Sequence, residues 1–146
     1  MPELIEKSVN ILLVAFVGGA LGGCGWFDDP SPESATVTLT GDAGQVVELL
    51  VSKQFVAGVD QNQVTRVQVF QGDTLRRAVP WDTTISIRIE QRFFVKMLDA
   101  DSVSQQLRMR VLIDANPEYD KAGQASEVFQ FVYTFNQPVT NVVELI

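Results

Sequence analysis

Histidine is absent from this chain of 146 residues, and cysteine occurs once, as Cys24. Histidine is the usual general base near neutral pH and the commonest ligand of transition metals, so its absence excludes catalysis by Ser/His/Asp or Cys/His arrangements. A single cysteine forms no internal disulfide and, without histidine, supplies no zinc site of Cys and His ligands. We therefore expect no enzymatic activity, no metal site and no cofactor.

Basic side chains are also scarce. The chain has 11 Lys and Arg residues against 18 Asp and Glu residues, a formal charge of −7. This balance disfavours attraction to phosphate backbones, so nucleic acid is not an expected partner. With 46% hydrophobic and 20% charged residues, the composition is that of a folded protein. The length suits one domain after a short N-terminal segment.

An uncharged, apolar run over residues 9–27 is the most prominent feature that the chain does have. In one interpretation, residues 11–20 are the hydrophobic region of a secretory signal. The four residues that follow, LGGC, resemble the lipobox of bacterial lipoproteins. The resemblance implies cleavage before Cys24, a diacylglycerol on its sulfur and an acylated new N-terminus. Because Gly25 follows the cysteine, the resemblance also favours the outer membrane.

In the other interpretation the apolar run is retained as a transmembrane helix. Its 19 residues would rise about 28 Å in a helix, enough to cross the hydrocarbon core of a bilayer. Gly18 and Gly22, like Gly19 and Gly23, are four positions apart and would form a face where another helix packs closely. The sequence leaves both interpretations open.

Both interpretations export the rest of the chain, because Lys7 precedes the apolar run and acidic residues follow it from Asp28. We therefore expect a membrane-anchored protein with its folded domain on the periplasmic or extracellular side. Residues 28–34, DDPSPES, are unsuited to a helix or a central strand because of their two prolines. The predicted organisation is a signal peptide or anchor helix over residues 1–27, a linker, and a β-sandwich over residues 35–146.

Short runs of alternating hydrophobicity, separated by turn residues, fill the chain after residue 35 and predict strands. We expect an all-β fold, an antiparallel β-sandwich of seven or eight strands, similar in outline to immunoglobulin-like or fibronectin-like domains. The sequence GDAG predicts a hairpin at residues 41–44, and QGDT predicts a second turn at residues 71–74. Pro80 and Trp81 favour an edge strand or a change of sheet.

The longest alternating run predicts a single strand over residues 84–98. A second run predicts a strand over residues 106–113, and residues 116–126 predict a polar loop. The aromatic row at residues 129–135 predicts a strand that fills the core. The side chains that these runs turn inward are Ile85, Ile87, Ile89, Phe93, Val95, Met97, Leu107, Met109, Val111, Ile113, Phe129, Phe131, Tyr133 and Phe135.

Three groups of residues are candidates for contact with other molecules. Asp99 and Asp101 alternate like the first ligands of a calcium loop, but the glycine and glutamate of an EF-hand do not follow, so we expect a solvated turn. Trp81 could stack on a sugar ring or lie against another protein. If the strands at 84–98 and 106–113 pair, a basic strip forms on their outer face and could meet lipid phosphates or an acidic subunit. The members of this strip are Arg88, Arg92, Lys96, Arg108 and Arg110.

These features predict a non-catalytic protein whose role is physical contact. The leading hypothesis is a structural accessory subunit that braces a larger membrane protein assembly, such as a respiratory or light-harvesting complex, with membrane lipids and other subunits as partners. The glycine face and the basic strip motivate it. The alternative is an outer-membrane lipoprotein that binds carbohydrate or cell-wall polymer through Trp81.

Overall fold

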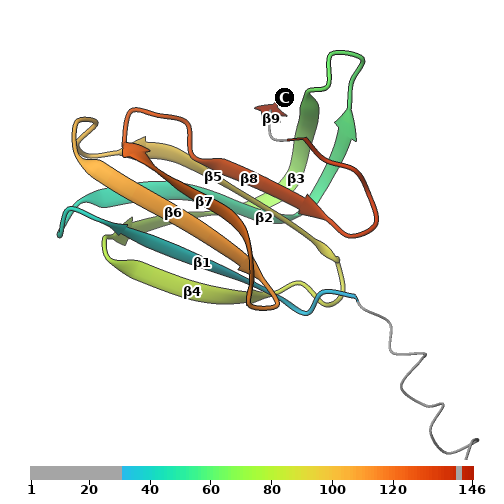
Figure 1. Ribbon diagram of the computed structural model, residues 1–146, viewed down its shortest axis with the longest axis horizontal. Coiled ribbons are helices and arrows are strands. Elements are labelled where there is room, and N and C mark those ends of the chain that lie inside the picture. Colours follow the sequence, from blue (N-terminus) through green and yellow to red (C-terminus); the bar gives the residue numbers. More distant parts are fainter. Residues whose placement is uncertain (1–30, 141–142) are drawn as a thin grey trace, which may run out of the picture. The chain divides into compact units, whose positions relative to one another are not determined.

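The computed structural model describes residues 31–140 and 143–146, and this part of the chain contains nine β-strands and no helix (Figure 1). The sequence pattern predicted seven or eight strands. The strands are β1 (Ser34–Gly41), β2 (Val46–Val59), β3 (Thr65–Ala78), β4 (Trp81–Ser86), β5 (Arg92–Ala100), β6 (Gln106–Ile113), β7 (Asn116–Gln124), β8 (Gln130–Thr134) and β9 (Val143–Leu145).

The strands form two sheets that face each other as a sandwich. One sheet has four strands in the order β4-β1-β6-β7, and the other has five in the order β8-β5-β2-β3-β9. The pairing of β3 with β9 is parallel and the other pairings are antiparallel. Alternate apolar side chains from both sheets meet in the main core, among them Leu39, Leu49, Phe93, Val95 and Met109. The predicted all-β, mainly antiparallel sandwich is therefore confirmed.

The hairpin predicted at residues 41–44 is wrong. This turn joins the two sheets instead, since β1 pairs with β4 and β6 while β2 pairs with β3 and β5. Each of the two strands carries a buried row, represented by Val37 and Leu39 in β1 and by Val47 and Leu49 in β2. When the strands lie in opposite sheets, these rows face each other across the core and are buried together.

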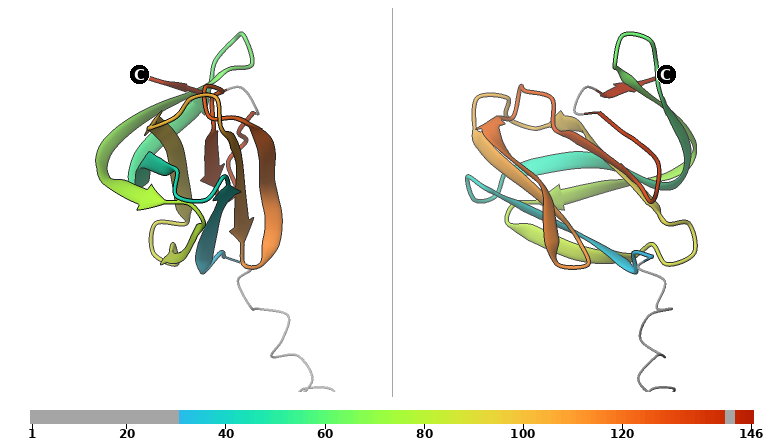
Figure 2. Two further views of the ribbon diagram at one scale, coloured as in Figure 1. Left: turned by 90° about the vertical axis from the view of Figure 1, so that its left-hand side faces the viewer. Right: turned by 45° about the vertical axis from the view of Figure 1, so that its right-hand side comes forward.

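The turn predicted at residues 71–74 is also wrong, because β3 passes through this stretch without interruption. The irregularity lies in the partner strand, where β2 has a register shift between Val51 and Phe55. The Ser52 hydroxyl donates to the carbonyl of Gln71 at 2.5 Å within this bulge. Gly72 fits closely, since a Cβ there would lie 2.7 Å from the Leu50 side chain. Residues 71–74 thus lie where the paired strands β2 and β3 bend, not in a turn (Figure 2).

The single strand predicted over residues 84–98 is broken into β4 and β5, which lie in different sheets. Between them the chain makes a turn in which the Gln91 amide donates to the carbonyl of Ile87 at 2.7 Å and Gln91 adopts a φ of 52°. Ile87 is fully buried, but Ile89 is 88% exposed. The inward position predicted for Ile89 is therefore wrong, because the turn interrupts the alternation before β5 begins.

The change of sheet expected at Pro80 and Trp81 is confirmed. β3 belongs to the five-stranded sheet, whereas β4, which begins at Trp81, is an edge strand of the four-stranded sheet. The Val79–Pro80 peptide bond is cis, and Val79 itself is buried in the main core. Its amide donates to the carbonyl of Gln45 at 2.8 Å, so the connection is held against the turn that precedes β2.

The polar loop predicted at residues 116–126 is largely a strand. β7 pairs with β6 through a two-residue turn in which Asp114 and Ala115 have φ values of 47° and 67°, as a type I′ hairpin requires. The Asp114 carboxylate also accepts from the amides of Glu33 and Ser34 and so fixes the start of β1. Because β7 is an edge strand with mostly exposed side chains, its hydrophobic alternation is too weak to be recognised.

The aromatic row of the last strands fills the core in part, as predicted. Phe129 is fully buried, and Phe131 and Tyr133 are half-buried against the main core. A second apolar cluster lies on the opposite face of the five-stranded sheet, because Phe94 and Val132 point the other way from their neighbours. Side chains after β8 complete it, and the C-terminus lies beside the projecting β2–β3 hairpin (Figure 2).

Helices long and apolar enough to cross a bilayer do not occur in residues 31–140 and 143–146. The predicted lipid-attachment residue Cys24 and the predicted packing glycines lie outside the described residues, as do all of residues 1–30. Those glycines are Gly18, Gly19, Gly22 and Gly23.

Candidate functional site

The sandwich is open along the side where β3 and β4 form the neighbouring edges of its two sheets. A cleft of about 330 Å³ lies there, and Trp81 is one of its lining residues. The lining comes from β2, β3 and β4, and consists of Val51, Ser52, Lys53, Gln54, Gln71, Gly72, Asp73, Leu75, Arg77, Trp81, Thr83 and Ile85. We name it the β3–β4 cleft.

Apolar side chains form the floor of the β3–β4 cleft. Val51 belongs to the main core, and Leu75 and Ile85 are half-buried against it. Trp81 also packs against this core, and the Arg77 guanidinium lies over its ring, 5.9 Å from the centroid. The half-buried indole thus contacts both the core and Arg77 in the cleft wall.

Charged groups lie around the opening. Lys53 donates from Nζ to the carbonyl of Ser86 at 3.1 Å and pairs with Glu90 at 3.4 Å. Arg77, in contrast, forms no ion pair with any residue of the described chain. The cleft therefore combines an apolar floor with one cation in its wall that is available to an acidic group of another molecule.

The main chain of β4 pairs with another strand on one side only. The Ile87 amide donates to the carbonyl of Glu33 at 2.9 Å, and this fixes which residues of the strand face β1. Main-chain groups alternate in direction along an antiparallel strand, so those of Thr83 and Ile85 also face β1. Those of Asp82 and Thr84 point away from the sheet toward the open edge.

β3 presents a second free edge on the other side of the cleft. The Val79 amide donates to Gln45, and the same alternation turns the main-chain groups of Leu75 and Arg77 toward β2. The groups of Thr74 and Arg76 therefore point outward, where the Arg76 carbonyl accepts from the Arg77 guanidinium at 2.9 Å. β9 covers only the start of β3, from Thr65 to Val67.

The carboxylates singled out in the sequence do not converge on a deep site. Asp99 and Asp101 line a shallow hollow of about 70 Å³, together with Glu48 and Arg76. The Asp101 carboxylate accepts from the Val46 amide at 3.0 Å, which is a structural role. Among the described residues no cluster of acidic or sulfur ligands could hold a metal ion.

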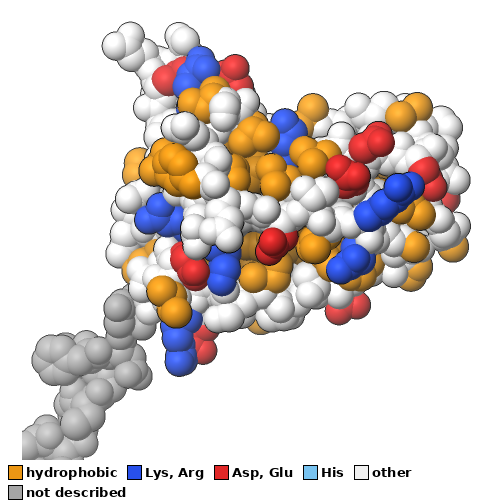
Figure 3. Space-filling view, turned by 180° about the vertical axis from the view of Figure 1, so that it is seen from behind, with side chains coloured by type: hydrophobic (Ala, Val, Ile, Leu, Met, Phe, Trp, Pro, Cys, Tyr) orange, Lys and Arg blue, Asp and Glu red, His pale blue; other side chains and the backbone are white. Residues whose placement is uncertain are grey.

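The expected basic strip is divided between the outer faces of different sheets, because β5 and β6 do not pair. Arg92 and Lys96 share the direction of Phe94 on the five-stranded sheet, and the Arg92 guanidinium donates to the carbonyl of Phe55 at 2.7 Å. Arg88 lies in the turn after β4 and pairs with Glu33. Seen from behind, the molecule shows positive and negative side chains intermixed rather than a continuous basic surface (Figure 3).

Arg108 and Arg110 lie on the outer face of the four-stranded sheet and share Asp120 of β7. Arg108 donates to both oxygens of Asp120 at 2.7 Å, and these hydrogen bonds lower the pKa of the carboxyl group below its usual range. The same contact raises the pKa of Arg108. Both arginines are therefore engaged with a neighbouring strand.

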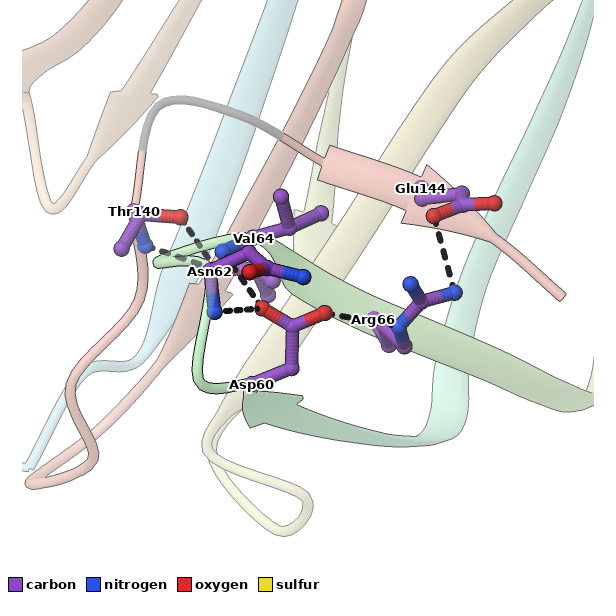
Figure 4. A network of polar contacts seen from close by, with 7 residues as sticks. Asp60, Asn62, Val64, Arg66, Thr140 and Glu144 are labelled. Atoms are coloured by element: carbon purple, nitrogen blue, oxygen red, sulfur yellow. Dashed lines mark hydrogen bonds and ion pairs between the residues drawn. The ribbon is translucent and has the colours of Figure 1, made fainter.

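A polar network joins the β2–β3 hairpin to the C-terminal strand (Figure 4). The Asp60 carboxylate accepts from the amides of Asn62 and Val64 at 2.8 and 3.1 Å, and from Arg66 at 3.0 Å. Arg66 in turn pairs with Glu144 at 2.9 Å. The network holds the tip of the hairpin and β9 together, away from the β3–β4 cleft.

We expect the Asp60 network to be sensitive to acid. The hydrogen bond from the Val64 amide, followed by those from Arg66 and Asn62, lowers the pKa of Asp60. In the unfolded chain the pKa of an aspartate is about 3.9, and above that pH the ionised carboxylate of Asp60 stabilises the fold. This stabilisation is lost as the pH falls below that value toward the lower pKa of the folded chain. Asp60→Asn should therefore be less stable than the natural chain at pH 7, by urea denaturation, and the difference should narrow below about pH 4. A difference that stays constant with pH would contradict this.

Apart from Trp81, the lining of the β3–β4 cleft was not recognised from the sequence. Because residues 71–74 have the composition of a turn, the sequence pattern predicted a break in the strand that contributes Asp73, Leu75 and Arg77. In the structure β3 continues through Gly72, and these three residues lie on one face of the strand.

A second hollow, of about 270 Å³, lies between β7 and β8 and is bordered by Thr140 and Val143, next to residues that the structure does not describe. The β3–β4 cleft is therefore the better defined candidate site. Comparisons of the chain with the models of known protein families and with curated proteins gave no match, so its function is argued from this geometry.

Proposed function

We propose that this chain is an exported, membrane-anchored, non-catalytic protein that braces a larger membrane protein assembly, and that it contacts another subunit through the β3–β4 cleft. In this proposal residues 9–27 are a spanning helix, or the apolar run belongs to a lipoprotein signal that is cleaved before Cys24. The sandwich is an immunoglobulin-like module on the periplasmic side. The apolar run and the acidic residues that follow it support the anchoring and the export.

The observation that carries the proposal is the open side of the sandwich. An apolar floor, the Arg77 cation without an ion pair and two strand edges with outward main-chain groups all meet at the β3–β4 cleft. Such a combination suits a polypeptide, whose side chains and main chain use all three features. A sugar ring would need a free aromatic face, but the ring of Trp81 is covered by Arg77 and packed against the core.

Thr83→Arg tests this proposal, because Thr83 is a half-buried residue of the cleft wall and an arginine side chain would occupy the cavity. The tagged full-length chain would be purified from membranes in mild detergent, and the mass of the native complex measured. We expect the natural chain to be recovered in a larger assembly and Thr83→Arg to lose that assembly by about tenfold or more.

Thr84→Arg is the matched control, since the neighbouring side chain lies on the exposed outer face of the same strand. It should retain the assembly. Circular dichroism and thermal unfolding would establish that both variants fold. Recovery of the natural chain only as a free monomer, or an intact assembly with Thr83→Arg, would refute the proposal. Binding of the natural chain to cell-wall fragments, lost with Thr83→Arg, would favour the carbohydrate alternative instead.

A further inference from the structure

β4 has a free edge that is only partly covered. Edge strands of natural sheets are commonly blocked by charge, proline, a bulge or a covering segment, because their main-chain groups would otherwise pair with another strand. In β4 the Lys53 ammonium group covers the carbonyl of Ser86 at 3.1 Å. The outward main-chain groups of Asp82 and Thr84 have no hydrogen-bond partner in the described residues. The uncovered part of the edge lies beside Trp81.

The two faces of β4 differ, and a strand that is added to its edge would share these faces. Thr83 and Ile85 turn inward and line the β3–β4 cleft, whereas Asp82 and Thr84 turn outward and are exposed. A strand paired with this edge continues the pleat of the four-stranded sheet, so every second side chain would point into the cleft. The apolar floor of the cleft suits aliphatic side chains at those positions.

Charge further restricts the segment that fits. Arg77 lies on the β3 side of the cleft and has no ion pair with described residues, although the chain as a whole carries a formal charge of −7. The Arg77 guanidinium is held in place over the ring of Trp81. A carboxylate in the added segment would be complementary to this fixed cation.

We propose, building on the function proposed above, that the partner subunit supplies an extended segment that adds to the free edge of β4 as a further strand. Alternate aliphatic side chains of this segment lie on the floor of the β3–β4 cleft, and an acidic side chain meets Arg77. The added strand closes the open side of the sandwich. The interaction is thus strand addition, in which main-chain hydrogen bonds supply binding and the cleft supplies specificity.

Residue-resolved hydrogen exchange tests this inference on the assembly that is purified with the tagged full-length chain. In the free chain, the amides of Asp82 and Thr84 should exchange rapidly, while those of Thr83 and Ile85 are protected by β1. In the assembly, the amides of Asp82 and Thr84 should exchange at least about 100-fold more slowly. Unchanged exchange at both positions in an intact assembly would overturn strand addition.

A pair of variants at Asp82 provides an independent test. Asp82→Pro removes an outward amide that forms no internal hydrogen bond, and proline is tolerated at such positions of edge strands. Asp82→Asn removes the same charge but keeps the amide. We expect Asp82→Pro to reduce the recovered assembly by about tenfold and Asp82→Asn to leave it unchanged. Equal recovery with both variants would refute strand addition, and if Asp82→Pro fails to fold, the exchange measurement decides.

These outcomes separate the inference from the function on which it rests. If Thr83→Arg abolishes the assembly but the amides of Asp82 and Thr84 exchange as in the free chain, the subunit contact stands and strand addition fails. If the natural chain is recovered only as a monomer, both fail. If the two amides are protected and Asp82→Pro releases the partner, both are supported.

Discussion

Ile87→Ala is expected to lower the free energy of unfolding by about 2–5 kcal/mol, whereas Ile89→Ala should change it by less than about 0.5 kcal/mol. Ile87 is fully buried in the main core, and Ile89 is 88% exposed in the turn before β5. Truncating the first removes apolar contacts and leaves a cavity, but truncating the second removes a side chain that is already in water. Urea denaturation at neutral pH, with the midpoint and slope of each curve, measures both values.

The two variants form a matched pair, because the residue type and the substitution are identical and the positions are two apart. A continuous strand over residues 84–98 would bury both isoleucines and give similar losses of stability. Similar losses would therefore contradict the break between β4 and β5. A large loss at Ile87 alone would support both the turn and the assignment of the two strands to different sheets.

The sequence pattern predicted the faces of the strands better than their partners. Phe93 and Val95 are buried as the alternation indicated, and so are Met109 and Val111. Which strand lies beside which depends on long-range packing, and here local turn signals were misleading. GDAG at residues 41–44 resembles a hairpin turn, yet it joins the two sheets because this brings two apolar rows together.

Backbone conformation explains most of the remaining differences. Gln91 and Ala115 have positive φ values, which are uncommon for residues other than glycine and are not indicated by the sequence around them. The first ends the turn that divides residues 84–98, and the second completes the hairpin that leads into β7. Both were therefore missed, although the inward positions of Ile87, Phe93 and Ile113 were predicted correctly.

The candidate site was predicted in part. Trp81 was singled out for its position after a proline, and it does line the main cleft. The basic residues were singled out because they are clustered in the sequence, but sheet assignment separates them, since Arg92 and Lys96 lie on one sheet and Arg108 and Arg110 on the other. Arg77, which was outside the predicted strip, lies in the cleft wall and has no ion pair with described residues.

The position of the cleft follows from the way the chain changes sheet. β3 and β4 are consecutive, but β4 ends the four-stranded sheet, whereas β3 forms an edge of the five-stranded sheet beyond the residues that β9 covers. Consecutive strands that do not pair leave two edges and a gap between them, and in this domain the gap has a core-like floor at Leu75 and Ile85. The open cleft in which we propose strand addition is thus a direct consequence of the topology.

Gly41→Ala is expected to destabilise the fold by about 2–3 kcal/mol, because β1 and β6 approach each other too closely at this point to admit a side chain. A Cβ on Gly41 would lie 2.3 Å from the carbonyl oxygen of Gln106 and 3.2 Å from the Cα of Leu107. Both are main-chain atoms of the paired strand, so relief requires the strands to separate. The φ of 158° at Gly41 adds to the strain for any other residue.

Gly58→Ala is the control, since a Cβ at Gly58 meets nothing within 4 Å and its backbone angle suits other residues. Its replacement should leave stability unchanged or raise it by up to about 1 kcal/mol, because alanine restricts the unfolded chain. Thermal and urea unfolding of both variants would measure the contrast. If Gly41→Ala were as stable as Gly58→Ala, the β1–β6 register and the turn that crosses between the sheets would both be wrong. The opposing edges of β3 and β4 depend on that crossing, so this substitution also tests the framework of the cleft.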